Sequence, residues 1–166
     1  MVETTPEDIL HRSEAAVGII YSNGEIILIK RMERKGDPWT GQIALPGGFS
    51  KPGEIPQETV IREVMEEVNL GFSKESIYAE LEPKSPNRAS WIKVHPFVLK
   101  TESLTGYSAG PEVSEVRSVR LDSRVPSRTD SGYESFIFRD WTVWGLTYRI
   151  LVDFIAFENR LIRGFE

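Results

Sequence analysis

The sequence predicts a domain of the α+β class, and three stretches of the chain carry this prediction. Two apolar runs, residues 15–21 and 25–30, flank an Asn-Gly pair, which is the strongest short signal for a β-hairpin. Apolar residues recur at helical spacing after Pro56 and again from Gly145 onward. Strands, an internal helix, further strands and a closing helix are compatible with a sheet that packs against helices.

Composition indicates one compact domain. A chain of 166 residues with 40% hydrophobic content is long enough to bury the core of one domain but too short for two domains. We therefore expect one domain over residues 1–166, with residues 1–13 as a candidate N-terminal extension. A net charge of −5 argues against general nucleic-acid binding, because phosphate backbones attract basic surfaces.

The chain contains no cysteine, which excludes disulfides, zinc–thiolate sites and a thiol nucleophile. This composition fits a reducing compartment, so we expect a cytoplasmic protein. We find no signal peptide and no apolar run long enough to span a membrane, and we expect no membrane association.

Further elements follow from local patterns. After the hairpin comes a third apolar run, residues 43–45, and the glycines of Pro46-Gly47-Gly48 allow a tight turn. We expect strands at residues 91–100, 116–121 and 134–138, with loops at 80–90, 107–114 and 122–133. An amphipathic helix that begins near Gly145 closes the chain.

The internal helix carries an unusual set of charges. Apolar side chains recur on one side of it, and acidic ones fall within an arc of about 100° on the other. The apolar set is Ile61, Val64, Met65 and Val68, and the acidic set is Glu63, Glu66 and Glu67. Glu54, in the loop just before the helix, could add a further carboxylate oxygen.

Like charges at this spacing repel one another and call for a compensating cation, which Arg62 alone cannot supply. Hard carboxylate oxygens that converge on one point suit Mg²⁺ or Mn²⁺. A solvated acidic face is the alternative interpretation, since most helical charge runs have no other role.

The spacing of these residues favours the cation site over the solvated acidic face. Gly48, Glu54, Arg62, Glu63, Glu66 and Glu67 reproduce the pattern G-x5-E-x7-R-E-U-x-E-E-x-G-U, in which U is a bulky aliphatic residue. This stretch resembles the Nudix box. Asn69 stands where the pattern has glycine, and we interpret it as a helix C-cap with positive φ, which Asn tolerates better than other residues with a Cβ.

The resemblance implies a Nudix α/β/α sandwich, with a mixed sheet between the box helix and the C-terminal helix. It also implies that Glu63, Glu66 and Glu67 hold catalytic cations and that Arg62 orients them. The implied reaction is divalent-metal-dependent hydrolysis of the diphosphate bond in a nucleoside diphosphate linked to another group. Glu66, Glu67 or Glu112 could accept the proton of the attacking water.

Two segments outside the box are similar to parts of coenzyme A pyrophosphatases, namely residues 41–48 and 144–147. We therefore expect coenzyme A or a derivative as substrate, with Arg31, Arg34, Gly47 and Gly48 in contact with it. ADP-ribose, a dinucleoside polyphosphate or a nucleoside triphosphate remain alternative substrates. A catalytically inactive binding or regulatory module is a further alternative, and a homodimer remains open because many members of the family are dimers.

Overall fold

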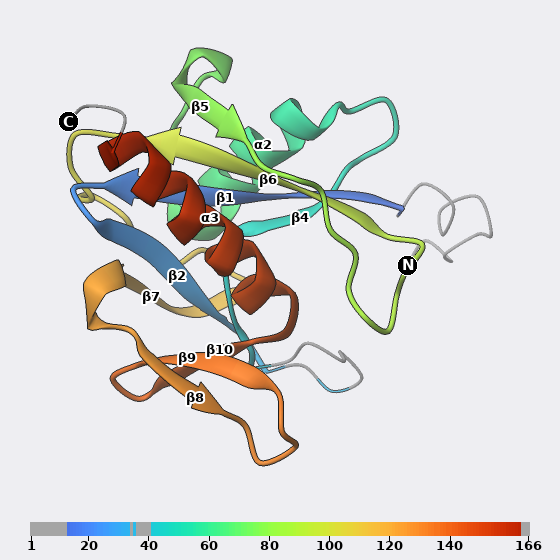
Figure 1. The fold of residues 1–166 in the computed structure, drawn as a ribbon. Helices are drawn as coiled ribbons and strands as arrows, with labels where there is room; N and C mark the ends of the chain where they lie inside the picture. Colours follow the sequence, from blue (N-terminus) through green and yellow to red (C-terminus); the bar gives the residue numbers. More distant parts are fainter. Residues whose placement is uncertain (1–12, 34, 36–40, 164–166) are drawn as a thin grey trace.

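The computed structural model describes residues 13–33, 35 and 41–163 of the chain, apart from the side chains of residues 162 and 163 (Figure 1). The predicted N-terminal extension, except for residue 13, and the predicted substrate residue Arg34 lie outside the described residues. No helix in the described part is long and apolar enough to cross a membrane.

A mixed seven-stranded sheet forms the centre of the described molecule. Its main path runs β3-β2-β1-β6-β5, while β4 pairs with β1 and β7 pairs with β2. β1 runs parallel to β6 and antiparallel to β2 and β4. The strands are β1 (Glu14–Ser22), β2 (Glu25–Arg31), β3 (Ile43–Ala44), β4 (Gly47–Phe49), β5 (Ile77–Glu80), β6 (Lys93–Lys100) and β7 (Val113–Arg120).

The predicted hairpin is confirmed. β1 and β2 pair antiparallel, with Tyr21 opposite Ile26 and Ser22 opposite Glu25. Both turn residues have positive φ, 47° at Asn23 and 81° at Gly24. Asn and Gly tolerate this conformation better than other residues, and its twist matches that of the flanking strands.

A separate three-stranded sheet contains β8 (Val125–Arg128), β9 (Glu134–Phe138) and β10 (Trp141–Trp144). The strand at residues 134–138 was predicted and is confirmed. The prediction of a loop over residues 122–133 is wrong in part, because β8 lies within it and pairs with β9. Pro126 disfavours a strand, so the local sequence does not indicate one, and the pairing with β9 defines this segment as a strand.

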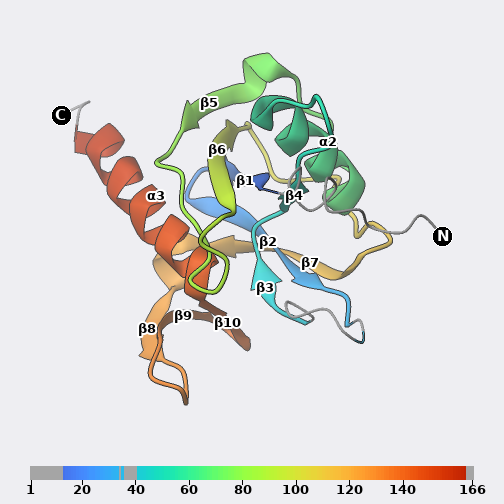
Figure 2. The same cartoon turned by 90° about the vertical axis from the view of Figure 1, so that its right-hand side faces the viewer.

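Two helices cover opposite faces of the main sheet, α2 (Pro56–Val68) and α3 (Gly145–Arg163). Figure 2 shows the sheet between them, with α2 on one side and α3 on the other. The predicted sandwich is confirmed, including the starts of both helices at Pro56 and Gly145. Two short 3-10 helices, Lys74–Ser76 and Leu121–Ser123, complete the elements of the described chain.

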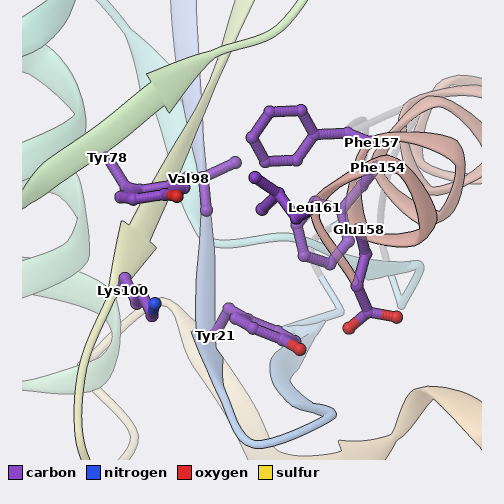
Figure 3. Close-up of a pocket in the computed structure, with 8 residues that line it drawn as sticks. All are labelled: Tyr21, Tyr78, Val98, Lys100, Phe154, Phe157, Glu158 and Leu161. Atoms are coloured by element: carbon purple, nitrogen blue, oxygen red, sulfur yellow. The ribbon is translucent and has the colours of Figure 1, made fainter. Parts of the chain in front are cut away.

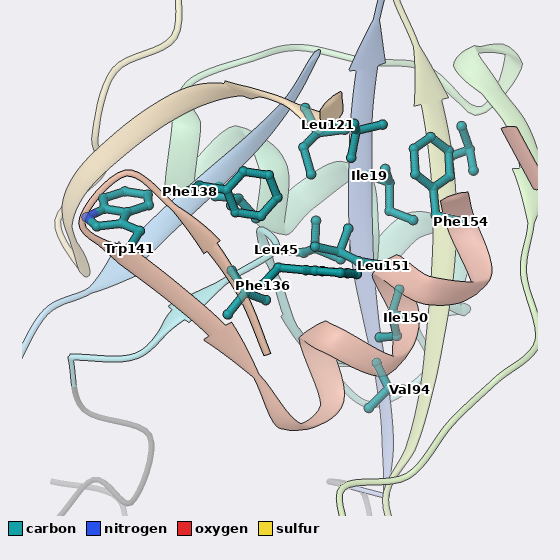
Figure 4. Packing of buried hydrophobic residues seen from close by; sticks show 14 of the residues in the cluster. Ile19, Leu45, Val94, Leu121, Phe136, Phe138, Trp141, Ile150, Leu151 and Phe154 are labelled. Atoms are coloured by element: carbon teal, nitrogen blue, oxygen red, sulfur yellow. The ribbon is translucent and has the colours of Figure 1, made fainter. Parts of the chain in front are cut away.

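The sheet is buried on both faces, so its strands contribute to two apolar clusters. In β2, Ile26 and Leu28 face the α3 side, whereas Ile27 and Ile29 face the α2 side. All four side chains are fully buried. Figure 4 shows the α3-side cluster, where residues of α3 meet aromatic side chains from β9 and β10.

The predicted apolar face of α2 needs one correction. Val64 and Val68 are buried, but Met65 is 48% exposed, and the fully buried apolar residue that the prediction missed is Val60. The face that packs on β1 is therefore rotated toward Val60 and Glu67. Gly18 of β1 permits this close packing, because a Cβ there would lie 3.1 Å from Val64 Cγ2. The rotation places one of the predicted surface glutamates inside the molecule.

Candidate metal-binding and catalytic site

Glu67 is the buried acid of the helix, with 5% of its surface exposed. Its Oε1 accepts a hydrogen bond of 2.6 Å from the backbone N–H of Gly47 in β4. Burial raises the pKa of Glu67 to about 8, and the charges of Glu63 and Glu112 add to this rise, whereas the Gly47 hydrogen bond and Arg31 oppose it. A buried carboxylate with acidic neighbours gains most from a nearby cation.

The glycine pair allows β4 to approach both β1 and the helix. A Cβ at Gly47 would lie 2.2 Å from the carbonyl oxygen of Ala16. At Gly48, a Cβ would lie 2.7 to 2.9 Å from the carboxylate of Glu63. The predicted tight turn is wrong here, because Gly47–Phe49 is a strand that pairs with β1. The close approach that these glycines permit in this structure is to the chain itself.

Arg62 joins the acidic residues. Its Nε and Nη2 donate to the two carboxylate oxygens of Glu54 at 2.8 and 2.9 Å, and Nη2 also donates to the carbonyl of Phe49. Its Nη1 donates to Glu63 at 2.8 Å and more weakly to Glu66 at 3.3 Å. Arg62 therefore holds one carboxylate oxygen of Glu63 and links α2 to Glu54 in the loop before the helix.

The hydrogen-bonding capacity of Glu54 is taken up within the chain. Besides Arg62, its Oε1 accepts from the Thr59 hydroxyl at 2.7 Å and from the Lys51 backbone at 3.1 Å. The Arg62 guanidinium lowers the pKa of Glu54 to about 2. This geometry favours a supporting role for Glu54 over the predicted role as a metal ligand.

Thr59 and Ser50 belong to the same network, and the sequence analysis missed them. Thr59 is fully buried, and its hydroxyl lies 2.6 Å from that of Ser50. The position of Thr59 beside the apolar residues of the helix could have indicated this network, because a buried hydroxyl needs a hydrogen-bond partner.

Four glutamates, which we call the acidic cluster, gather at this end of the sheet. Burial raises the pKa of Glu63, and the negative charges of Glu66 and Glu112 raise it further, while Arg62 acts in the opposite direction. The side chain of Glu66 is 52% exposed. The cluster consists of Glu63, Glu66 and Glu67 from α2, and Glu112 from the loop before β7.

The donor set of the acidic cluster fits a divalent cation. Its atoms are hard carboxylate oxygens, and the repulsion that raises the pKa of Glu63 and Glu67 is what a bound cation would relieve. Within the described residues, no group of three His, Cys, Asp or Glu side chains is yet arranged to hold a metal ion. Holding a cation here would therefore require rotation of side chains, for which the exposed Glu66 has room.

A loop brings Glu112 to the helix. Gly110 donates its N–H to the carbonyl of Glu67 at 2.9 Å, and a Cβ at Gly110 would lie 1.8 Å from the carbonyl oxygen of Glu66. Only glycine fits against the last turn of α2 in this way. The loop prediction for residues 107–114 is correct up to residue 112, since β7 starts at Val113.

Of the predicted cationic substrate residues, Arg31 lies near the acidic cluster. It ends β2 and is close enough to Glu67 to lower the pKa of that carboxyl. Arg34 lies outside the described residues. Arg31 therefore supplies positive charge beside the place where the acidic residues converge.

A hollow of about 200 Å³ lies elsewhere, between α3 and the sheet (Figure 3). Half of the residues that line it are aromatic, and Lys100 lies over the ring of Tyr78 at 5.1 Å. Its lining residues are Tyr21, Tyr78, Val98, Lys100, Phe154, Phe157, Glu158 and Leu161. None of these residues belongs to the acidic cluster, so the hollow is separate from the candidate site.

Two curated proteins are similar to parts of the chain. An ADP-ribose pyrophosphatase of Methanocaldococcus jannaschii is 48% identical over 61 residues, which cover 37% of this chain and 34% of that protein. An 8-oxo-dGTP diphosphatase of Escherichia coli is 34% identical over 80 residues, or 48% of this chain and 60% of that protein. The chain thus covers about one third of the length of the first protein and about three fifths of the length of the second.

Solved structures share the fold. A MutT/nudix family protein from Enterococcus faecalis superposes with a TM-score of 0.60 at 23% identity, over 80% of this chain and 50% of that one. A NUDIX hydrolase from Nitrosomonas europaea gives 0.55 at 25% identity, over 66% and 57%. The model of the NUDIX domain matches residues 11–139, which include α2, β4 and Glu112, and the chain therefore belongs to the Nudix family.

Proposed function

We propose that this protein hydrolyses the diphosphate bond of a nucleoside diphosphate linked to another group, with a divalent cation bound at the acidic cluster. One observation carries the proposal. Three glutamates of α2 and one from the loop before β7 lie close enough to act on one another electrostatically, beside Arg62 and β4, and the pKa values of Glu63 and Glu67 are raised. Such a charge arrangement has little structural value without a cation.

In the proposed site, Glu63, Glu66 and Glu67 hold the cation, which is Mg²⁺ or Mn²⁺. The bound cation supplies Lewis acidity toward the diphosphate and lowers the pKa of a water ligand. Arg62 keeps the Glu63 carboxylate in place, and the Gly47 N–H orients that of Glu67. Glu54 supports Arg62 rather than the cation.

Glu112 is our candidate for the general base. It is exposed, it lies on a loop rather than on the helix, and its charge acts on both Glu63 and Glu67. A carboxylate beside the cation, and not itself buried, can accept the proton of the attacking water. Glu66 and Glu67 remain the alternatives for this role.

ADP-ribose is the first substrate to test. The Methanocaldococcus relative, which has the highest identity of the two curated proteins, is named as an ADP-ribose pyrophosphatase. Coenzyme A, which the segments at residues 41–48 and 144–147 favour, is the second candidate. Because loops select the group attached to the diphosphate, the acidic cluster alone does not separate the two.

The test is hydrolysis by the purified protein with Mg²⁺ or Mn²⁺, with ADP-ribose, coenzyme A, a dinucleoside tetraphosphate and 8-oxo-dGTP as substrates. Mn²⁺ is included because a structural relative from Francisella tularensis was solved with AMP and a manganese ion. We expect cleavage at the diphosphate of ADP-ribose and none with EDTA. Absence of cleavage for every substrate would favour an inactive binding module, although all glutamates of the Nudix box are present.

A further inference from the structure

We propose that Asn69 is a positioning residue, whose side chain holds the loop that carries Glu112 against the end of α2. This inference rests on the proposed function, since it concerns the placement of a residue in that site. Its structural part can nevertheless be tested without any substrate.

The loop of residues 107–112 lies on the last turn of α2. Ser108 donates its N–H to the carbonyl of Val68 at 3.0 Å, and Gly110 donates to that of Glu67 at 2.9 Å. These bonds satisfy carbonyls that have no partner within a helix at its C-terminal end. At the end of the loop nearest β7, the carbonyl of Glu112 accepts a hydrogen bond of 3.1 Å from the backbone N–H of Met32.

Asn69 makes the side-chain contact between helix and loop. Its backbone is left-handed, with φ 58° and ψ 35°, and its N–H closes the helix on Met65. Its Nδ2 donates to the carbonyl of Ser108 at 3.0 Å and lies 2.8 Å from the Ser108 hydroxyl. Glycine, which the Nudix box pattern has at this position, would keep the backbone conformation and lose both bonds.

The consequence reaches Glu112, which follows Ser108 by four residues. Glu112 must lie near Glu63 and Glu67 to act there, and it follows by two residues Gly110, whose N–H is bonded to the carbonyl of Glu67 at 2.9 Å. Two backbone bonds and the Asn69 amide fix the loop at the α2 end. When the amide contact is lost, the loop can leave the helix more often, and Glu112 spends less time near the cation site.

A double-mutant cycle tests the coupling. We expect Asn69→Gly to lower kcat for the hydrolysed substrate three- to tenfold with little change in KM. In a Glu112→Gln background, the same change should cost less than twofold, because the residue that the contact positions is already disabled. Multiplicative losses in the double variant would overturn the inference.

Asn23→Gly is the matched control. Asn23 is also left-handed, with φ 47°, but it lies in the β1–β2 hairpin, and it should leave kcat unchanged. Ser108→Ala removes only the hydroxyl contact and should have a smaller effect than Asn69→Gly.

Amide hydrogen exchange gives a readout that needs no activity. The N–H groups of Ser108 and Gly110 should exchange at least fivefold faster in Asn69→Gly than in the wild type, and remain unchanged in Asn23→Gly. If the wild type cleaves no diphosphate, the proposed function fails, but faster exchange would still support the positioning contact. Unchanged exchange in Asn69→Gly would overturn it whether or not the protein is an enzyme.

Discussion

At the scale of single residues, the main finding is that charge and burial are uncoupled in α2. Helical geometry places Glu63, Glu66 and Glu67 on one arc, yet the three differ widely in exposure, from 5% for Glu67 to 52% for the side chain of Glu66. The difference arises because β4 lies over the Glu67 side of the helix and the Glu66 side remains open. Similar residues at similar spacing thus have distinct chemical environments.

Glu67→Gln should separate stability from activity. Glutamine keeps the shape and can still accept the Gly47 hydrogen bond, while it removes a buried carboxyl whose pKa is raised to about 8 and whose ionisation costs stability. We expect a melting temperature equal to or above that of the wild type. Divalent-dependent hydrolysis should fall at least a hundredfold, about 3 kcal/mol of transition-state stabilisation.

Steady-state kinetics at saturating Mg²⁺ and a thermal melt in EDTA check both parts of that prediction. Glu82→Gln, an exposed acid outside the cluster, is the control and should match the wild type. Near-normal turnover by Glu67→Gln would remove this residue from the site.

The Glu54–Arg62 pair should make the protein sensitive to acid. The pKa of Glu54 is about 2 in the folded chain and about 4.5 when unfolded, so its stabilising contribution is present above pH 4.5 and lost as the pH falls toward 2. At neutral pH, Glu54→Gln should cost up to about 3 kcal/mol of unfolding free energy. The difference from the wild type should shrink between pH 4.5 and pH 2.

Urea unfolding at several pH values, without divalent ions, measures that difference. Glu82→Gln again provides the comparison, with a small and pH-independent effect. A Glu54→Gln deficit that stays constant down to pH 2 would show that the carboxylate charge does not stabilise the fold.

At the scale of elements, the segments with strong local patterns could be predicted from the sequence, and the segments defined by their partners could not. The hairpin, α2 and α3 have turn, cap or periodicity signals of their own. By contrast, Gly47–Phe49 and Val125–Arg128 are strands only because they pair with β1 and β9. Glycine and proline obscure such strands, since both disfavour a strand in isolation.

The residues of the acidic helix were predictable, but their separate environments were not. The box pattern indicated which glutamates and which arginine to examine. It did not indicate that Glu54 binds Arg62 through both oxygens, or that Asn69 contacts Ser108, because these contacts join residues that are 8 and 39 positions apart. Such contacts depend on how the loops fold back on the helix.

The two glycines of β4 should respond differently to alanine. At Gly47 the added Cβ would meet the backbone of Ala16 at 2.2 Å, which a strand cannot relieve without losing its pairing. We therefore expect Gly47→Ala to lower the melting temperature by more than 10 °C or to prevent folding. At Gly48 the obstacle is the Glu63 carboxylate at 2.7 Å, a flexible group that can move.

Gly48→Ala should consequently fold but bind the divalent ion at least tenfold more weakly, since Glu63 is displaced from Arg62. Thermal melts and Mn²⁺ titrations of both variants check this contrast. Gly53→Ala is no suitable control, because φ is +78° there. Gly71→Ala, at an exposed position where the added Cβ would meet only the end of the flexible Met65 side chain at 3.2 Å, is the matched control. Equal melting temperatures for the two β4 variants would contradict the assigned contacts.

At the scale of the whole molecule, the sandwich separates two functions of the sheet. The α3 face carries the larger apolar cluster, and the α2 face carries a smaller cluster that ends at the acidic residues. Because the α2 face combines packing with repelling charges, cation binding at the proposed site would be linked to the stability of the fold. The link predicts a response of the entire fold to divalent ions.

Mg²⁺ or Mn²⁺ should therefore raise the melting temperature. A ligand at a hundred times its Kd that binds only the folded state adds about 2.7 kcal/mol of unfolding free energy. For a domain of this size, such a gain corresponds to a shift of about 5–10 °C. The shift should be largely absent in Glu67→Gln, because that variant lacks a ligand and has less repulsion to relieve. Melts at constant ionic strength, with the divalent salt replaced by NaCl in the reference sample, isolate specific binding from screening. A shift of equal size in Glu67→Gln and in the wild type would place the cation elsewhere on the protein.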